Sequence, residues 1–260
     1  MKSAYLKEDG VIIDKLIKPS CLIPSSAVRV RAIKNITREY PTMYKILIYR
    51  EPQIAPMPKN SRKIQPKASE FYEPTISSVS RTKRTIRDIV LCNDFDWFAT
   101  FTFDPDRVNR YDYNRCLSVM SIWLHRRKTF DPDFTYLVIP EFHKDGAIHF
   151  HALLGHFTGT MKDSHHFTSA GNPIFNITCF RSGFTTASPI MDKSGVASYV
   201  QKYITKDFVK RFNRRRFFCS KNLKRPIRTV NSPVFSATLP IFRRKVSDFP
   251  DSEYFIIDKF

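Results

Sequence analysis

Residues 140–154 read Pro-Glu-Phe-His-Lys-Asp-Gly-Ala-Ile-His-Phe-His-Ala-Leu-Leu, and this stretch decides the fold around it. Its second half predicts a β-strand from Ala147 to Leu154. Because successive side chains of a strand point to opposite faces, His149 and His151 share one face and Phe150 lies on the other. Two imidazoles on one face can meet one cation, although such a pair taken alone is more often structural.

The first half of the stretch supplies a carboxylate. Residues 134–142 are apolar and β-branched, which predicts a preceding strand, and Lys144-Asp145-Gly146 separates the two strands. A three-residue loop with a left-handed glycine places Glu141 directly opposite His149. A two-residue turn shifts the register and moves Glu141 to the other face. His143, nearer the turn, is a second candidate for the same site.

Two imidazoles and a carboxylate form a mixed nitrogen and oxygen donor set. Such a set suits Mn²⁺ or Zn²⁺, and it suits Mg²⁺ when waters and phosphate oxygens complete the octahedron. We therefore expect His149, His151 and Glu141 to be ligands of a divalent metal. The remaining histidines are expected at the surface: His125, His156, His165 and His166.

A second motif follows in residues 199–206, which read Tyr-Val-Gln-Lys-Tyr-Ile-Thr-Lys. It predicts a helix from Val196 to Phe208 with Ser194 as its N-cap. Residues four apart share a helix face, so Tyr199 and Tyr203 lie about 6 Å apart along the axis. The lysines, Lys202 and Lys206, pair in the same way, and a nearby cation favours the phenolate form of tyrosine. Packing for the tyrosines and solvation for the lysines are the alternatives.

Other elements are predicted by hydrophobic periodicity. A helix is expected over residues 75–93, a strand over Trp97–Phe103, a helix over residues 111–128, and further strands over Phe175–Phe180 and Gly183–Thr186. Residues 155–173, which contain three glycines, are expected to form an exposed loop. The resulting order of strand, helix, two or three strands and helix predicts an α+β domain.

The composition restricts the functional classes. The 260 residues include 43 Lys and Arg against 24 Asp and Glu, a formal charge of +19, which is typical of a protein that binds a polyanion such as nucleic acid. No run is long enough for a membrane span, and the N-terminus lacks a signal-peptide core, so we expect an intracellular protein. The five cysteines form no Cys-x-x-Cys pair and no nucleotide-binding P-loop is present, which argues against a zinc knuckle and an NTPase motor.

The chain is expected to contain three parts. Residues 1–74 form an N-terminal arm with a proline-rich linker, partly ordered, residues 75–209 form the main domain, and residues 210–260 form a basic, aromatic extension. Charge interleaved with aromatic rings suits single-stranded DNA, because every base has a face that can stack. The predicted DNA-binding residues are Arg214, Arg215, Arg216, Phe217, Phe218, Lys221, Lys224 and Arg225.

From Arg81 to Pro226 the sequence resembles the HUH endonucleases, and within them the two-tyrosine rolling-circle replication initiators of small single-stranded DNA phages and plasmids. The resemblance rests on Phe-Thr-Phe-Asp-Pro at 101–105, on the stretch 140–154 and on the tyrosine motif 199–206. Their order, their spacing and the doubled tyrosine all match.

The resemblance implies a ferredoxin-like or RNA-recognition-like fold, with a central antiparallel sheet of about five strands and flanking helices. It implies a site-specific single-stranded DNA endonuclease and ligase of the bacterial cytoplasm. Its metal, Mg²⁺ or Mn²⁺, would be bound by His149, His151 and Glu141, and Tyr199 and Tyr203 would be nucleophiles assisted by Lys202 and Lys206. The partners would be origin DNA and a separate helicase and polymerase of the host, with no membrane.

Two other classes stay open. A transposase or relaxase of the same superfamily is one, although paired tyrosines after the histidines argue against it. The other is a nonenzymatic binder of single-stranded nucleic acid in which Phe101 and Phe103 stack on bases and the histidines have no role.

Overall fold

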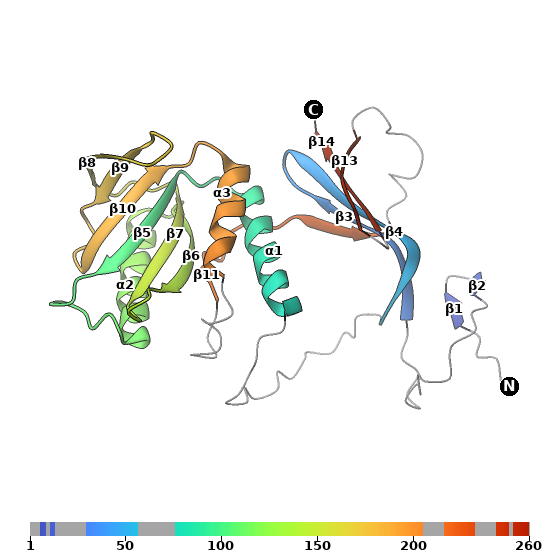
Figure 1. The fold of residues 1–260 in the computed structure, drawn as a ribbon, viewed down its shortest axis with the longest axis horizontal. Helices are drawn as coiled ribbons and strands as arrows, with labels where there is room; N and C mark the ends of the chain where they lie inside the picture. The colour runs from blue at the N-terminus through green and yellow to red at the C-terminus, as the bar shows by residue number, and fades with distance from the viewer. Residues whose placement is uncertain are drawn as a thin grey trace. The chain divides into compact units, whose positions relative to one another are not determined.

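The computed structural model describes residues 6–8, 11–13, 30–56, 76–204, 216–231, 243–249 and 252–259 (Figure 1). The chain divides into two compact units, each described here by itself. The terminal unit comprises residues 1–65 and 227–260, and the central unit comprises residues 66–226. None of the helices within the described residues combines the length and the apolar character needed to cross a membrane.

The terminal unit is built on one antiparallel sheet from both ends of the chain. Its strands lie in the order β12-β3-β4-β14-β13, with bounds Ile227–Val230, Val30–Glu39, Met43–Pro56, Ser252–Asp258 and Arg243–Phe249. Ile46, Phe255 and Ile257 are buried together at its centre. A separate hairpin pairs β1 (Leu6–Glu8) with β2 (Val11–Ile13). Strands from the N-terminal arm and the C-terminal extension therefore share hydrogen bonds.

This shared sheet was not anticipated from the sequence, which treats the two ends as separate segments. The backbone pairing of Glu39 with Ile227 joins residues far apart in the chain, and no local pattern encodes such a pairing. The predicted boundaries at residues 74 and 209 fall within residues 57–75 and 205–215, which lie outside the described residues.

The central unit contains an antiparallel sheet of seven described strands in the order β11-β6-β7-β5-β10-β9-β8. Their bounds are Phe218–Cys219, Thr135–Phe142, Ile148–Gly155, Trp97–Phe103, Gly183–Pro189, Pro173–Ile177 and Met161–Phe167. The histidine strand, β7, lies between β6 and β5. The α+β class is confirmed, whereas the sheet is larger than the predicted five strands.

One face of this sheet is covered by α2 (Tyr113–Phe130). Asp112 caps the helix by accepting hydrogen bonds from the backbone of Asn114 and Arg115. Helix side chains at spacings of three and four pack on the alternate residues of β5 and β7 that point toward them. This core includes Cys116, Met120, Trp123, Leu124, Phe101, Phe103, Phe150 and Ala152.

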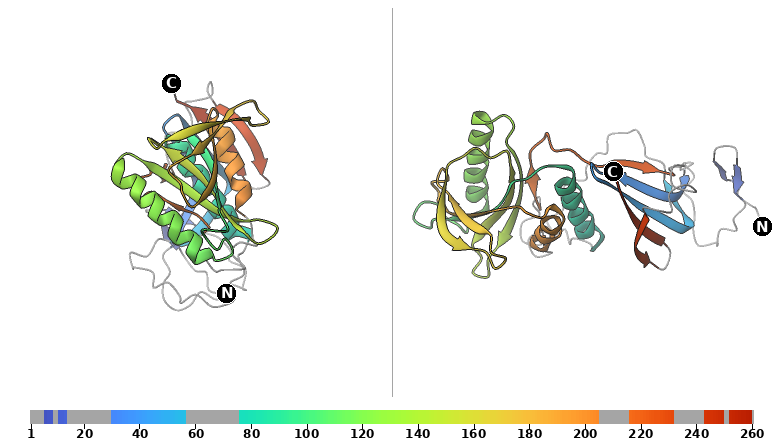
Figure 2. Two further views of the ribbon diagram at one scale, coloured as in Figure 1. Left: turned by 90° about the vertical axis from the view of Figure 1, so that its left-hand side faces the viewer. Right: turned by 90° about the horizontal axis from the view of Figure 1, so that it is seen from above.

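The opposite face carries α1 (Ile76–Cys92) and α3 (Lys193–Tyr199), which pack against each other (Figure 2). The apolar stripe predicted for α1 is confirmed, since Ile86, Ile89 and Val90 are fully buried. After α3 the chain makes a 3₁₀ turn, η1 (Val200–Tyr203), in which Val200 and Tyr203 are buried. The tyrosine motif therefore lies on the face of the sheet away from α2.

Three local expectations are wrong. Residues 161–167 form strand β8 instead of a loop; the strand lies at the sheet edge with most side chains exposed, so its polar composition resembles that of a loop. The tyrosine helix starts at Lys193, with Asp192 and not Ser194 as its N-cap. It also ends at Tyr199, because the chain tightens into η1, and residues 205–208 lie outside the described residues.

The burial of Phe101 and Phe103 bears on the nonenzymatic alternative. Their side chains are 0% and 1% exposed and lie in the core beneath α2. They cannot stack on a base without unpacking that core. Base stacking by these two phenylalanines is therefore excluded for the folded central unit.

Candidate functional site

The register of β6 and β7 brings a carboxylate to the histidine pair. His143 N–H donates to the carbonyl of Ala147 at 2.8 Å, and Gly146 has φ of 89°, so the loop has three residues and a left-handed glycine. Glu141 is consequently paired with His149, which confirms the conditional prediction. The Glu141 carboxylate reaches diagonally to His151, and its Oε2 lies 2.5 Å from Nε2.

Two threonines of β5 hold the imidazoles from the other side. Thr100 is paired with His151 and Thr102 with His149. The Thr100 hydroxyl lies 3.1 Å from Nδ1 of His151, and the Thr102 hydroxyl lies 3.3 Å from Nδ1 of His149. Each Nδ1 therefore has a partner, which orients the ring and directs Nε2 into the space beside Glu141.

Burial governs the protonation of both histidines. It lowers the pKa of His151 below its ordinary value, against the hydrogen bond with Glu141, which raises it. Burial likewise lowers the pKa of His149, with repulsion from His143 in the same direction. Both rings are therefore neutral at neutral pH, which is the form that binds metals.

The donor atoms do not form a closed metal cluster. Among the described residues, no three side chains of His, Cys, Asp or Glu lie close enough together to hold a metal ion. Glu141 bonds directly to His151, whereas His149 stacks on His143 with ring centroids 5.0 Å apart. His143, the rival ligand, has a side chain that is 60% exposed and lies 3.6 Å from a carboxylate oxygen of Asp145.

The two tyrosines lie against this histidine pair. The ring of Tyr203 stacks on that of His151, with centroids 3.7 Å apart and an angle of 18° between the planes. The Tyr203 hydroxyl donates to the Tyr199 hydroxyl at 3.0 Å. Phe98, on the same face of β5, stacks on Tyr203 and meets Tyr199 edge-on. The predicted meeting of the two motifs is therefore present in the fold.

The two phenols differ in exposure and acidity. Tyr199 is 46% exposed and Tyr203 is 8% exposed. A hydrogen bond with Lys202 lowers the pKa of Tyr199, and the bond from Tyr203 acts in the same direction. Burial raises the pKa of Tyr203 well above its ordinary value, and its hydrogen bond to Tyr199 adds to this. Tyr199 is therefore the phenol that ionises more readily.

Lys202 lies over the tyrosine pair. Its Nζ is 3.6 Å from the ring centroid of Tyr199 and 4.9 Å from that of Tyr203. The ammonium group is thus near the place where negative charge would form on a phenol oxygen. Lys206, its predicted counterpart, lies outside the described residues.

A cavity of about 510 Å³ opens beside Tyr199. Phe98, Pro189 and Met191 contribute apolar surface, and Asn172 and Thr186 contribute polar groups. Its walls come from β5, the loop between β8 and β9, β10 and the start of α3. A polymer crossing this face would therefore find space next to the exposed phenol.

Part of the predicted DNA-binding segment is bound to the central unit. The guanidinium of Arg216 donates to the hydroxyls of Thr82 and Ser78 on α1, both at 2.9 Å. Phe218, in β11, packs edge-on against Phe150. Phe217, Lys221, Lys224 and Arg225 are described, and Arg214 and Arg215 are outside the described residues. A DNA role for this segment stays a prediction, and Arg216 and Phe218 have structural contacts of their own.

Sequence reasoning missed Thr100, Thr102 and Phe98. The alternation Trp-Phe-Ala-Thr-Phe-Thr-Phe of β5 placed these three side chains on one face, which was readable from the sequence. Their partner strand was not, because the adjacency of β5 and β7 spans a helix and another strand.

Comparison with known protein families gives a match over the part of the chain that contains this site. Residues 96–208 match the family model described as replication-associated protein ORF2/gene 2 protein. The matched region begins at β5 and includes the whole histidine and tyrosine site. No curated protein and no solved structure gives a significant match.

Proposed function

Because the matched region is that of a replication-associated family, we propose that this protein initiates rolling-circle replication by nicking single-stranded DNA at an origin and later rejoining it. The observation that carries the proposal is the stacking of Tyr203 on His151 at 3.7 Å, with Glu141 hydrogen-bonded to the same imidazole. Two potential nucleophiles thus adjoin a donor set suited to a divalent cation. The basic composition supports a nucleic-acid substrate.

The chemistry of the donor set fits Mg²⁺ or Mn²⁺. His149, His151 and Glu141 would hold the ion, with Thr100 and Thr102 holding each imidazole through Nδ1. The 2.5 Å contact between Glu141 and His151 means that the carboxylate must turn away from Nε2 to leave room for an ion. When bound, the ion supplies positive charge to a non-bridging phosphate oxygen.

Tyr199 is proposed as the first nucleophile, on account of its exposure and its contact with Lys202. Its phenolate oxygen attacks phosphorus, an oxygen–phosphorus bond forms, and the bond to the 3′-oxygen breaks. The phenol has lost its proton, and the departing 3′-oxygen gains one. The product is a 5′-phosphotyrosyl link and a free 3′-hydroxyl, so the phosphodiester energy is kept without ATP.

Tyr203 is proposed for the second cleavage. After one round of synthesis it would cut the regenerated origin, and the new 3′-hydroxyl would attack the Tyr199 link and release a closed circle. The buried Tyr203 donates its proton to Tyr199 in the resting site. Removal of Tyr199 into a phosphodiester takes away a lowered-pKa neighbour and leaves Tyr203 free to change partner.

The strand order supports the finer fold assignment. The inner strands β6, β7, β5 and β10 are antiparallel, with α2 connecting β5 to β6, an arrangement compatible with the proposed ferredoxin-like HUH fold. A transposase or relaxase of that superfamily is the second candidate. The hydrogen bond between two tyrosines at one site favours the initiator, which needs two successive cleavages.

Covalent capture tests the proposal without knowledge of the origin. The full chain is incubated with labelled single-stranded oligonucleotides of random central sequence, with Mg²⁺, with Mn²⁺ or with chelator. We expect a protein–DNA adduct that survives denaturing electrophoresis with either metal and is absent with chelator. Sequencing of the captured strands would give the preferred site. Retention of DNA that is reversed by denaturation in every condition would contradict nicking and favour a nonenzymatic binder.

A further inference from the structure

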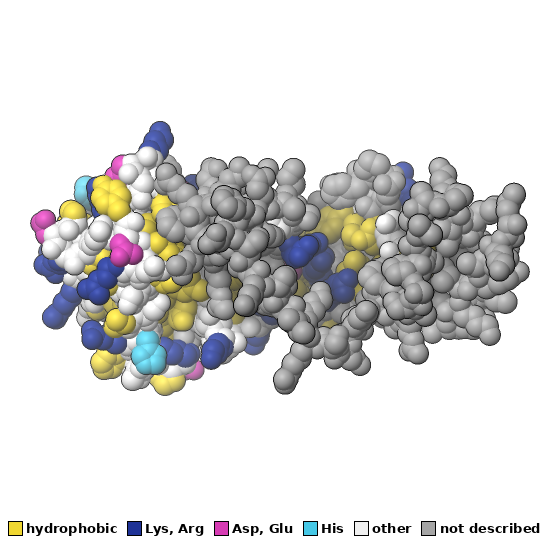
Figure 3. All heavy atoms as spheres, turned by 90° about the horizontal axis from the view of Figure 1, so that it is seen from below, with side chains coloured by type: hydrophobic (Ala, Val, Ile, Leu, Met, Phe, Trp, Pro, Cys, Tyr) yellow, Lys and Arg dark blue, Asp and Glu magenta, His cyan; other side chains and the backbone are white. Residues whose placement is uncertain are grey.

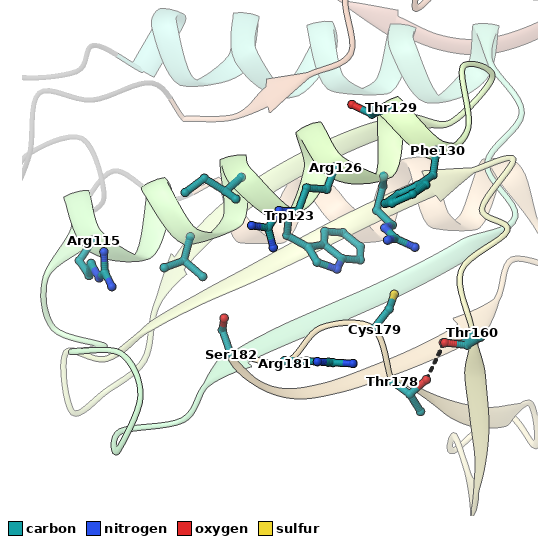
Figure 4. Close-up of a pocket in the computed structure, with 13 residues that line it drawn as sticks. Arg115, Trp123, Arg126, Thr129, Phe130, Thr160, Thr178, Cys179, Arg181 and Ser182 are labelled. Atoms are coloured by element: carbon teal, nitrogen blue, oxygen red, sulfur yellow. Dashed lines mark hydrogen bonds between the residues drawn. The ribbon is translucent and has the colours of Figure 1, made fainter.

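A second groove lies on the opposite side of the central unit from the tyrosines (Figure 4). It has a volume of about 960 Å³ and runs between α2 and the turn that joins β9 to β10. The stripe Arg115, Val119, Ile122, Arg126 and Phe130 forms its helix wall, at spacings of three and four residues. Arg181 and Cys179 belong to the turn and form the other wall.

The charge of this groove has one sign. Four arginines, Arg115, Arg126, Arg127 and Arg181, are among its described lining residues, and none of those residues is acidic. Arginines without an acidic neighbour keep their bidentate donors available for phosphate or carboxylate. Figure 3 shows Lys and Arg side chains among hydrophobic ones on the described surface of the central unit.

Buried donors beneath the groove give an independent indication. Trp123 is 7% exposed and lines the groove, and its indole N–H has no acceptor among the described residues. The Nε of Arg127 is also buried and without an acceptor among them. An unpaired buried donor costs about 1–3 kcal/mol, so both groups gain from a ligand rich in acceptors.

The shape of the groove selects a polymer over a small anion. Arg115 and Arg126 are about 16 Å apart along the helix axis, at a rise of ~1.5 Å per residue. One phosphate cannot contact both, whereas a strand with several phosphates can. The groove also has exposed apolar groups, since Phe130 is 75% and Ile122 is 50% exposed. Arg127 lies 5.0 Å from the Phe130 ring centroid.

From these observations we infer that the groove between α2 and the β9–β10 turn binds a stretch of single-stranded nucleic acid. Arginines contact the phosphates and Phe130 stacks on a base, the combination that binds single strands without reading their sequence. This stretch is distinct from the one at Tyr199, which lies across the sheet. The inference does not require the nicking chemistry.

The test measures binding of oligothymidylate to the full chain in chelator, where no cleavage takes place. Arg115→Gln/Arg126→Gln removes two phosphate contacts. Each contact contributes about 0.7 to the slope of log affinity against log salt for single strands, so the slope should fall by about 1.4. Lys34→Gln/Lys162→Gln removes the same charge from exposed positions elsewhere, and it should leave the slope within a fraction of that change.

Cys179 supplies a local readout. It lines the groove, so bound oligothymidylate should slow its alkylation, as measured by peptide mass spectrometry, in the unaltered chain and in the lysine control but not in the arginine variant. Equal alkylation with and without DNA would overturn the inference, even if the salt slope fell. Protection by a polyglutamate peptide but not by DNA would assign the groove to an acidic protein segment instead. Because no cleavage is needed, the outcome is separate from that of the nicking proposal.

Discussion

The two faces of strands β5 and β7 differ in what they contribute. Toward α2 they present Phe101, Phe103 and Phe150, which are 0–1% exposed and touch only other core side chains. Toward α3 the same strands present Thr100, Thr102, His149 and His151, joined by hydrogen bonds. The alternation of one residue separates stability from chemistry, so substitutions on the two faces should have separable effects.

The largest effect on activity is expected on the polar face. His149→Ala/His151→Ala removes both proposed imidazole ligands, and adduct formation should fall at least about 100-fold, the usual scale for losing charge stabilisation in a transition state. Thermal unfolding should change little. Single-turnover rates with excess Mn²⁺ measure the loss.

The control for the histidine variant is His165→Ala/His166→Ala on the exposed strand β8. It should form adduct at the normal rate. Normal rates in the His149 and His151 variant would show that the imidazoles have no part in cleavage.

The apolar face should show the converse pattern. Phe101→Ala leaves a cavity beneath α2, and unfolding free energy should fall by about 3–5 kcal/mol, as for other large-to-small core changes. Denaturant unfolding gives the value. Phe184→Ala, at a position 67% exposed, is the matched control and should cost less than about 0.5 kcal/mol. Equal losses at the two positions would refute the assignment of this face to stability.

A smaller effect should separate the two tyrosines. In the first cleavage, Tyr199→Phe should be slower than Tyr203→Phe by at least about tenfold, because one unit of pKa corresponds to about tenfold in phenolate population. The rate of first adduct formation on a single-site oligonucleotide distinguishes them. The reverse order would assign the first attack to the buried Tyr203.

The smallest effect concerns Lys202. Its hydrogen bond lowers the pKa of Tyr199, so Lys202→Gln should let that pKa rise, and the pH at which cleavage accelerates should move upward. At neutral pH we expect a loss of about tenfold, recovered at higher pH. Lys202→Arg keeps the charge and should retain the normal profile. A uniform loss at all pH values would point to phosphate binding instead.

Local rules predicted much of the central unit. The periodicity of residues 97–103 and 111–128 anticipated β5 and α2 closely, since each segment buries one regular stripe. The left-handed Gly146 and its three-residue loop determined the register that places Glu141 opposite His149. These features depend on neighbours within a few residues.

What escaped prediction depends on distant partners. Strand β8 has a polar composition because it lies at an edge, and only its pairing with β9 identifies it as a strand. The sheet of the terminal unit joins residues near 40 to residues near 230 and 255. The threonines that orient the histidines were recognisable as a polar face, but their partner strand was set by tertiary contacts. The unequal environments of Tyr199 and Tyr203 likewise arise from packing on Phe98 and His151.

The most direct test of the central claim is to map the covalent adduct. The full chain is trapped on single-stranded DNA, digested with protease and nuclease, and the nucleotide-bearing peptide is identified by mass spectrometry. The account predicts the modification on Tyr199 in a first cleavage and its complete loss in Tyr199→Phe/Tyr203→Phe, with binding of DNA retained. A nucleotide attached to another residue, or an adduct that persists in the double variant, would contradict it.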